Sequence, residues 1–404
     1  MERLAPESPE ETEEAVATAL AEGRPLEILG RGSKRGFGRP VVADVLLSTE
    51  RLSGITLYEP GELVMSAGAG TPLAEIEAAL AEHRQELAFE PADYGPISGG
   101  EAGVQTIGGV FACNLSGPRR IRAGAARDHL LGLRCVTGFG RAIKTGGRVM
   151  KNVTGYDLCK LLTGSFGTLA VVTELTFKVL PAAETEGTLL IRGDLEIDLL
   201  AALRAAMGTP FDVSGAALLP VATAARSTVA AVAGAGRAVA ALRVEGPAPS
   251  VRYRLERLTA VLTGEGRDFA SLEAEDSRRL WREIRDLSPL PGEGCLWRLS
   301  IPPTAGGALA SRFADLAPDR LYDWAGGLVW LAVPEVSAAE AAELREAFAG
   351  CGGHATLVRA PEAVRAEIEV FQPQPAPLAA LGRRVKRSFD PERILNRGRM
   401  YRDC

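Results

Sequence analysis

The chain has 404 residues, 46% of them hydrophobic and 24% charged, and a formal net charge of −5 at pH 7. This composition is that of a soluble globular protein, the length favours two domains over one, and the acidic balance argues against a nucleic-acid-binding protein. The acidic N-terminus lacks the apolar region of a secretory signal, and no apolar run is long enough to span a membrane. We therefore expect a cytoplasmic protein, and association with a membrane through a partner stays open.

Cysteine and histidine are too sparse and too scattered for a metal site. The six cysteines are widely spaced without a Cys-x-x-Cys pair, and no two of the three histidines share a helix face. We therefore expect neither a zinc site nor an iron–sulfur cluster held by this chain.

The first elements in chain order are a helix and a strand that ends in a glycine-rich turn. The pattern predicts a helix over residues 8–23, with Ser8 as N-cap and Glu11 completing a capping box. The strand Leu26–Leu29 then runs into Gly30-Arg31-Gly32-Ser33-Lys34. Successive backbone N–H groups in such a turn can form an anion-binding nest, to which Ser33 and Lys34 add a hydroxyl and a positive charge.

The Gly30–Lys34 loop matches neither of two widespread phosphate-binding motifs. Arg35 stands where a Rossmann fingerprint has its third glycine, and the order Gly-Ser-Lys differs from the Gly-Lys-Ser of a P-loop. On these residues alone, a phosphate site and an ordinary surface turn are equally good interpretations.

Glycine organises the segment Gly95–Pro181, where pairs such as Gly108-Gly109 separate strand-like apolar runs. Such a density of glycine in an ordered domain indicates positive φ angles and close approach of backbone to a ligand, here an extended cofactor that carries phosphate. The elements expected up to this segment's end are strands over Val45–Ser48, Gly54–Glu59 and Leu63–Ala67, a helix that Thr71 caps, a hairpin of Leu131–Thr137 and Ala142–Thr145, a helix over Tyr156–Thr163 and a strand over Leu169–Val179.

Residues 182–380 alternate strands with helices and contain few glycine pairs. This alternation predicts an α/β or α+β domain with one sheet covered on one face. Expected strands are Gly187–Arg192, Val213–Leu219, Ala238–Glu245, Cys295–Ile301, Leu328–Val333 and Ala355–Arg359, and expected helices are 248–262, 276–287, 306–316 and 337–349. A loop over Pro373–Pro377, a basic helix over Leu381–Phe389 and turns at Asn396 and Gly398 end the chain, and we expect this ending to dock on the first domain.

The first 181 residues resemble the FAD-binding domain of the vanillyl-alcohol oxidase type. The resemblance is carried by Gly30–Lys34, Ser66–Pro72, Pro91, Thr106–Gly109 with Asn114, Arg127–Gly132 and Gly164–Glu174. Within that superfamily the chain is similar to the family of FAD-binding subunits of bacterial glycolate oxidases, with Val149–Asp157 as the most specific piece and Trp297-Arg298, Gly353–Leu357 and Phe389–Tyr401 as further ones.

This resemblance implies an α+β fold in which two subdomains of an FAD-binding domain (1–181) hold the cofactor, an α/β cap or substrate domain (182–380) covers the isoalloxazine ring, and residues 381–404 return to the FAD domain. The residues it implies for FAD binding are Gly30, Arg31, Gly32, Ser33, Lys34, Pro91, Thr106, Ile107, Gly108, Gly109, Asn114, Gly117, Gly167 and Val172. The FAD is expected to be noncovalent, because no histidine stands near Ser33 for a covalent link. Implied partners are a second, catalytic FAD-binding subunit and an iron–sulfur subunit.

The catalytic residues stay open at this stage. Oxidation of a 2-hydroxy acid needs a base and a cation for the carboxylate. His354 is the only histidine of the cap, and Arg298, Arg285 and Arg359 are possible carboxylate partners, although structural roles are the commoner ones for such residues. Three functions therefore remain: a glycolate dehydrogenase subunit that oxidises its substrate, a flavin-carrying accessory subunit, and a stand-alone oxidase of another hydroxy acid such as D-lactate.

Overall fold

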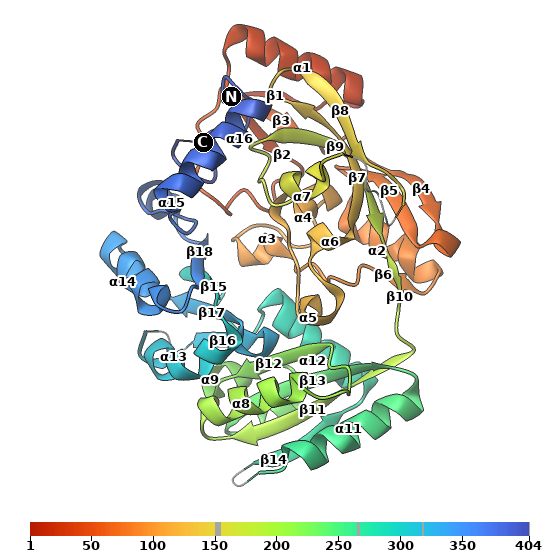
Figure 1. The fold of residues 1–404 in the computed structure, drawn as a ribbon, viewed down its shortest axis with the longest axis vertical. Helices are drawn as coiled ribbons and strands as arrows, with labels where there is room; N and C mark the ends of the chain where they lie inside the picture. Colours follow the sequence, from red (N-terminus) through yellow and green to blue (C-terminus); the bar gives the residue numbers. More distant parts are fainter. Residues whose placement is uncertain (150–154, 265–266, 317–318, 404) are drawn as a thin grey trace. The chain divides into compact units, whose positions relative to one another are not determined.

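The computed structural model describes residues 1–149, 155–264, 267–316 and 319–403, so residues 150–154 of the motif Val149–Asp157 lie outside the described residues. The chain divides into two compact units (Figure 1). Unit 1 consists of Met1–Ser116, Ala125–Ala182 and Glu369–Cys404, and unit 2 of Gly117–Gly124 and Ala183–Ile368.

These limits differ from the domain limits expected at 181 and 380. The return to unit 1 begins at Glu369, because the Phe371 ring packs against Phe37 and Phe166 at centroid distances of 6.0 and 4.9 Å. An inserted loop of unit 2, Gly117–Gly124, interrupts the first domain and was not foreseen.

The first layer of unit 1 is a small parallel sheet covered by one helix. Strands β1 (Glu2–Leu4), β3 (Val45–Ser48) and β2 (Leu26–Leu29) pair in that order beside α1 (Pro9–Glu22). Helix α1 begins as predicted, since the Ser8 hydroxyl accepts from the Glu11 N–H at 3.1 Å. The Glu11 carboxylate, however, accepts from the N–H of Glu7 at 2.8 Å and not from that of Ser8, so the capping box is displaced by one residue.

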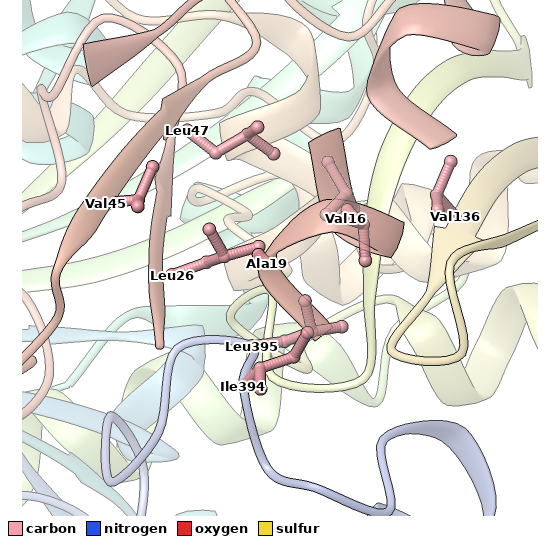
Figure 2. Close-up of a cluster of buried hydrophobic side chains, with 9 residues drawn as sticks. Val16, Ala19, Leu26, Val45, Leu47, Val136, Ile394 and Leu395 are labelled. Atoms are coloured by element: carbon pink, nitrogen blue, oxygen red, sulfur yellow. The ribbon is translucent and has the colours of Figure 1, made fainter. Parts of the chain in front are cut away.

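A core cluster of buried aliphatic side chains joins this sheet to the chain's end (Figure 2). Its members come from α1, β2, β3, the second sheet and the C-terminal segment: Val16, Ala19, Leu26, Val45, Leu47, Val136, Val171, Ile394 and Leu395. The main chain continues this contact, because the N–H of Leu26 donates to Ile394 and the N–H of Asn396 donates to Leu26. The ending of the chain is therefore part of the core of unit 1.

The second layer of unit 1 is a five-stranded antiparallel sheet with short helices. Its order is β4 (Ile55–Glu59), β5 (Val64–Gly68), β9 (Ala170–Lys178), β7 (Leu130–Thr137) and β8 (Arg141–Gly146). The other elements of unit 1 are η1 (Pro60–Glu62), α2 (Leu73–Glu82), β6 (Gln85–Glu86), α3 (Tyr94–Ile97), α4 (Ile107–Cys113), α6 (Ala126–His129), α7 (Leu158–Leu162), β10 (Leu180–Pro181) and α16 (Ala376–Phe389). Helix α16 begins five residues earlier than expected because Pro377 occupies its first turn, where a missing N–H costs nothing.

Unit 2 is built on one eight-stranded antiparallel sheet. Its order is β14 (Asp268–Leu272), β11 (Thr185–Gly193), β13 (Ala238–Gly246), β12 (Gly215–Leu219), β16 (Asp319–Asp323), β17 (Leu328–Val333), β15 (Cys295–Ser300) and β18 (His354–Arg359). Its helices are α5 (Arg120–Ala123), α8 (Glu196–Met207), α9 (Val221–Ala224), α10 (Ala230–Ala233), α11 (Ala248–Leu262), α12 (Ala274–Asp286), α13 (Pro303–Leu316), η2 (Trp324–Gly326), α14 (Ala338–Ala349) and α15 (Glu362–Glu367). Strands β14 and β16, helices α5, α8, α9, α10 and α15 and the 3-10 turn η2 were not predicted.

Helices cover both faces of this sheet, so the expectation of one covered face was wrong. Gly187 of β11 lies against Val251 and Leu255 of α11. The next residue, Thr188, accepts a hydrogen bond from the Trp281 indole of α12 at 2.8 Å. Since successive strand residues point to opposite faces, α11 and α12 pack on opposite sides. None of the described helices is both long enough and apolar enough to cross a membrane.

Candidate functional site: a cofactor cleft in unit 1

One cleft of unit 1 brings together most of the residues predicted to bind the cofactor. Its lining includes Gly30, Arg31, Gly32, Ser33, Lys34, Thr106, Gly108, Gly109, Gly167 and Val172. It is completed by Ala170, which lies in the segment 167–173 expected to run along the cofactor, and by residues that were not expected in this role: Glu27, Ile28, Leu29, Arg35, Thr49, Ala69, Ala112, Cys113, Ser165, Phe166, Asn396 and Arg399.

Four predicted residues do not line the cleft. Pro91 and Ile107 are buried, and the Ile107 side chain is fully inside the core. Asn114 ends α4 in the left-handed region, with φ of 52°, and its Oδ1 accepts from the Arg127 N–H at 3.0 Å. Gly117 belongs to unit 2. Asn114 therefore shapes the cleft's supporting loop, and Gly117 has a different role, described below.

The Gly30–Lys34 loop presents free backbone donors. Gly32 has φ of 83°, which turns the chain sharply. Within the described part of the chain, no acceptor takes a hydrogen bond from the N–H groups of Arg31, Gly32 or Ser33. Adjacent unsatisfied N–H groups at a cleft form a nest for an anion.

The glycines on both sides of the cleft permit backbones to approach closely. A Cβ on Gly30 would lie 2.6 Å from the Thr106 hydroxyl oxygen, and a Cβ on Gly108 would lie 2.6 Å from the Ala69 carbonyl oxygen. Neither position has room for another side chain. The Thr106 hydroxyl accepts from the Gly109 N–H at 3.4 Å and so caps α4, a short helix that the sequence analysis did not predict.

Lys34 places a buried amine at the wall of this cleft. Its Nζ donates to the Ser33 hydroxyl at 3.2 Å and to the Gln105 Oε1 at 3.1 Å, both neutral acceptors. Burial is the main cause that lowers the pKa of this amine to about 8, while the Cys113 thiol and the Asp93 carboxylate act against that change. A buried cation that hydrogen-bonds neutral groups favours an anionic ligand, because the ligand's charge offsets the cost of desolvation.

The C-terminal segment holds the cleft loops in place. Arg399 donates to the carbonyl oxygens of Lys34 at 2.7 Å and Arg35 at 3.2 Å, which fixes the loop with its carbonyls away from the nest. The Asn396 amide accepts from the Ile28 N–H at 2.7 Å and donates to the Phe166 carbonyl at 2.8 Å. The sequence signal for these contacts was the stretch Phe389–Tyr401, which carries part of the resemblance. It predicts that the chain's end docks on the first domain but not which residues it contacts.

A buried ion pair anchors that segment in turn. The Lys386 amine is 2.6 Å from the Asp390 carboxylate and also donates to the carbonyls of Thr168 and Leu395. Asp390 further accepts from the N–H groups of Ile394 at 3.0 Å and Leu395 at 2.8 Å. Lys386 is thus structural, although its basic neighbourhood suggests an exposed residue.

The weak catalytic candidates all lie in unit 2, and the structure separates them into two groups. Arg285 pairs with Asp286 at 2.7 Å, and Arg359 donates to carbonyl oxygens of the loop 291–294, so both serve local structure. Arg298 and exposed His354 instead lie near each other on one sheet face, as described below. Among the described residues, no group of three or more histidine, cysteine, aspartate or glutamate side chains is arranged to hold a metal ion.

The cleft fits FAD on the chemistry of its donors. The nest at Gly30–Ser33 and the buried Lys34 amine suit a pyrophosphate. Comparisons with known proteins agree, since residues 3–146 match the family described as "FAD binding domain". The solved "4-ethylphenol oxidase from Gulosibacter chungangensis: isoeugenol complex" shares the fold with a TM-score of 0.71 at 16% identity, over 99% of this chain and 89% of that one. The chain therefore carries an FAD-binding domain and shares its fold with that solved oxidase.

The particular family follows from one relative that matches over nearly its full length. Over 393 residues the chain is 35% identical to "Glycolate oxidase subunit GlcE" of Escherichia coli (strain K12), with 96% of each chain covered. A shorter match, 40% identical over 117 residues, is to "Glycolate oxidase subunit GlcD" of Bacillus subtilis (strain 168) and covers 29% of this chain and 23% of that protein. The chain belongs to the family of the glycolate oxidase subunit GlcE, and it is an FAD-linked oxidoreductase.

Proposed function

We propose that this chain is the FAD-carrying subunit of a glycolate oxidase complex. The observation that carries the proposal is the combination, at one cleft, of the Gly30–Ser33 nest with the buried amine of Lys34. The similarity over 96% of a glycolate oxidase subunit supports the substrate class, a small 2-hydroxy acid.

In this proposal the side chains of unit 1 bind and orient the cofactor. The nest and Lys34 hold the pyrophosphate, while Asn396 and Arg399 keep the loops at their spacing. Thr106, Gly108 and Gly109, together with Gly167, Ala170 and Val172, line the remainder of the cleft. FAD, when bound, supplies the hydride acceptor that the protein's own side chains lack. The noncovalent mode expected from the sequence also belongs to this proposal.

We also propose the two partners in their specific form, a second FAD-binding subunit and an iron–sulfur subunit. The names of the relatives describe separate subunits of a glycolate oxidase, which supports a multi-subunit assembly. The electrons taken from substrate would leave through such partners. Unit 2 is proposed to be the cap that meets substrate.

An anaerobic visible spectrum, recorded before and after addition of glycolate, tests the proposed function. If glycolate bleaches the yellow isolated chain, the chain is a dehydrogenase by itself. If glycolate bleaches the flavin only after the chain is reconstituted with its partner subunits, the chain is the accessory form. Bleaching by D-lactate but not by glycolate would support the alternative of an oxidase for another hydroxy acid. A colourless chain that takes up no added FAD would refute the proposal.

A further inference from the structure

Two arginines and a histidine gather around one tryptophan of unit 2. The Arg120 guanidinium lies over the Trp324 ring, 4.5 Å from its centroid, and the Arg298 guanidinium lies 5.2 Å from the same centroid. The positive charges of both guanidiniums lower the pKa of the nearby His354 imidazole. We call Arg120, Arg298, Trp324 and His354 the Trp324 cluster.

The sheet places Arg298 and His354 on a common face. Arg298 of β15 pairs with Thr356 of β18, and Ser300 pairs with His354 in the same ladder. Residues two apart on a strand share a face, so the side chains of these two cross-strand pairs form one polar strip: Arg298, Ser300, His354 and Thr356. Trp330 of β17, which pairs with Arg298 on its other side, adds an aromatic wall with its ring centroid 5.9 Å from the guanidinium.

The inserted loop Gly117–Gly124 is fixed so that Arg120 reaches this strip. Arg119 forms a largely buried ion pair with Glu245 at 2.6 Å, and Arg122 pairs with Asp212 at 2.5 Å. The Trp324 indole donates to the Gly117 carbonyl at 3.2 Å. The two neighbouring arginines thus serve as anchors, while Arg120 between them stacks on the indole.

Trp324 itself sits in a costly backbone conformation. Its φ is 52° and that of Ala325 is 54°, a region that residues with a side chain seldom adopt. The Asp323 carboxylate accepts from the Trp324 N–H at 2.7 Å and supports the turn. Strain of this kind persists where the surrounding structure demands it and is concentrated at functional sites.

We propose that the Trp324 cluster binds the carboxylate of a small 2-hydroxy or 2-oxo acid. Two guanidiniums offer planar donors for one carboxylate, the indole faces exclude water from one side, and His354, Ser300 and Thr356 offer partners for the adjacent oxygen. The choice of ligand rests on the proposed function, whereas the site itself rests only on residues of unit 2. Arg120 and Arg298 are assigned as the carboxylate-binding residues, and Arg119 and Arg122 as positioning residues.

The protonation of His354 provides a signal for the bound anion. His354 keeps part of its surface exposed, but desolvation of the rest of the ring is the main cause that holds the pKa of this imidazole below its ordinary value of 6.5, ahead of the charges of Arg298 and Arg120. Helix α14 lies on the other side of the sheet, where Arg345 is 5.1 Å from the Trp297 ring, so its charges do not face His354. A bound carboxylate offsets the two arginines and therefore raises the pKa of His354.

Binding of glycolate to the full-length holoprotein tests the site under anaerobic conditions, with the flavin reduced beforehand so that glycolate cannot be oxidised. We expect titration calorimetry to show at least 10-fold weaker binding in R120Q and in R298Q, an intermediate loss in R298K, and no change in R257Q, where an exposed arginine of α11 serves as control. Acetate, which lacks the hydroxyl, should bind more weakly than glycolate. NMR titration of the three histidines, with the signal of His354 assigned by H354N, should show its pKa rise on saturation with glycolate.

Two outcomes would overturn this inference: wild-type affinity in both R120Q and R298Q, or a His354 titration that glycolate leaves unchanged. The bound FAD of each sample, read from its visible absorbance, separates this failure from failure of the proposed function. Normal FAD with no glycolate binding refutes the carboxylate site alone, whereas loss of FAD from the wild-type chain refutes the cofactor assignment alone.

Discussion

Replacement of Lys34 by methionine separates the amine's contribution to cofactor binding from its cost to folding. The amine is buried at the cleft wall and hydrogen-bonds only the neutral side chains of Ser33 and Gln105 among the described residues. Methionine keeps the length and apolar stem of the side chain but removes the charge. We expect K34M to bind FAD more weakly and yet, without FAD, to unfold at a higher denaturant concentration than the wild-type protein.

The size of both effects follows from the burial of this amine. Its pKa falls from 10.5 to about 8 on folding. Since one pKa unit corresponds to about 1.4 kcal/mol, burial of the charged form costs the folded apo-protein about 3 kcal/mol at neutral pH. A hydrogen bond from a charged group is worth about 1.5–3 kcal/mol, so loss of the contact to the pyrophosphate should weaken FAD binding by about 10- to 150-fold.

The pH dependence gives a second signature, with opposite signs for the two properties. Between pH 8 and 10.5 the unfolded chain binds more protons at Lys34 than the folded apo-protein does, so the stability of the apo-protein rises with pH in that window. FAD raises the pKa of the amine, and the affinity for FAD therefore falls as pH increases above about 8. K34M should lose both trends.

Flavin fluorescence titrations and urea denaturation of the apo-protein, each at several pH values from 7 to 10, measure the two effects. K144M, at an exposed lysine of β8, is the matched control and should behave as the wild-type protein. If K34M binds FAD within twofold of the wild-type affinity and with the same pH profile, Lys34 does not contact the cofactor and the reasoning fails.

Three further variants examine the cleft and its supports. G32D places a carboxylate at the nest and should weaken FAD binding at least 100-fold. G32A imposes the same strain of a positive φ without the charge and should weaken FAD binding far less. Equal losses of affinity in the two variants would mean that no anion binds at the nest. K386M breaks the buried ion pair with Asp390 and should lower the free energy of unfolding by about 3–5 kcal/mol, measured by denaturation with flavin release as the signal. R383Q, which breaks an exposed ion pair, is the control and should lower it by at most about 1 kcal/mol. Similar losses in both variants would contradict the burial of the Lys386–Asp390 pair. N396A removes the hydrogen bonds that join two cleft walls and should weaken FAD binding about 10-fold, as measured by equilibrium dialysis. R397Q, at an exposed neighbouring residue, is the control. An unchanged affinity in N396A would mean that the Asn396 amide does not position the cleft walls for FAD.

The local parts of the cleft could be predicted because their geometry depends on residues adjacent in sequence. A strand that ends in Gly30-Arg31-Gly32 places several N–H groups side by side whatever the rest of the chain does. The same holds for the hairpin of β7 and β8 and for the alternation of β9, where apolar residues recur with period two.

The long-range parts could not be predicted from local patterns. Arg399 contacts the carbonyl of Lys34, 365 positions away, and neither residue's neighbours encode that pairing. A run of basic residues indicates a solvated helix, so the burial of Lys386 was missed, and its partner four residues later was the only hint. In the inserted loop, three nearby arginines have separate roles that only the tertiary partners Glu245, Asp212 and Trp324 distinguish.

The route of the chain through unit 1 has a consequence for the order in which its cofactor site forms. Unit 1 is assembled from three segments, and the last of them begins only at Glu369. The nest residues are present early in the chain, but the carbonyls behind them are held by Arg399, and the walls at Ile28 and Phe166 are joined by Asn396. The cleft therefore reaches its final spacing only when the chain's end has docked. A ligand that binds the folded state alone adds its binding free energy to that docking step, so FAD should protect residues 394–399 from hydrogen exchange as strongly as it protects the Gly30–Lys34 loop.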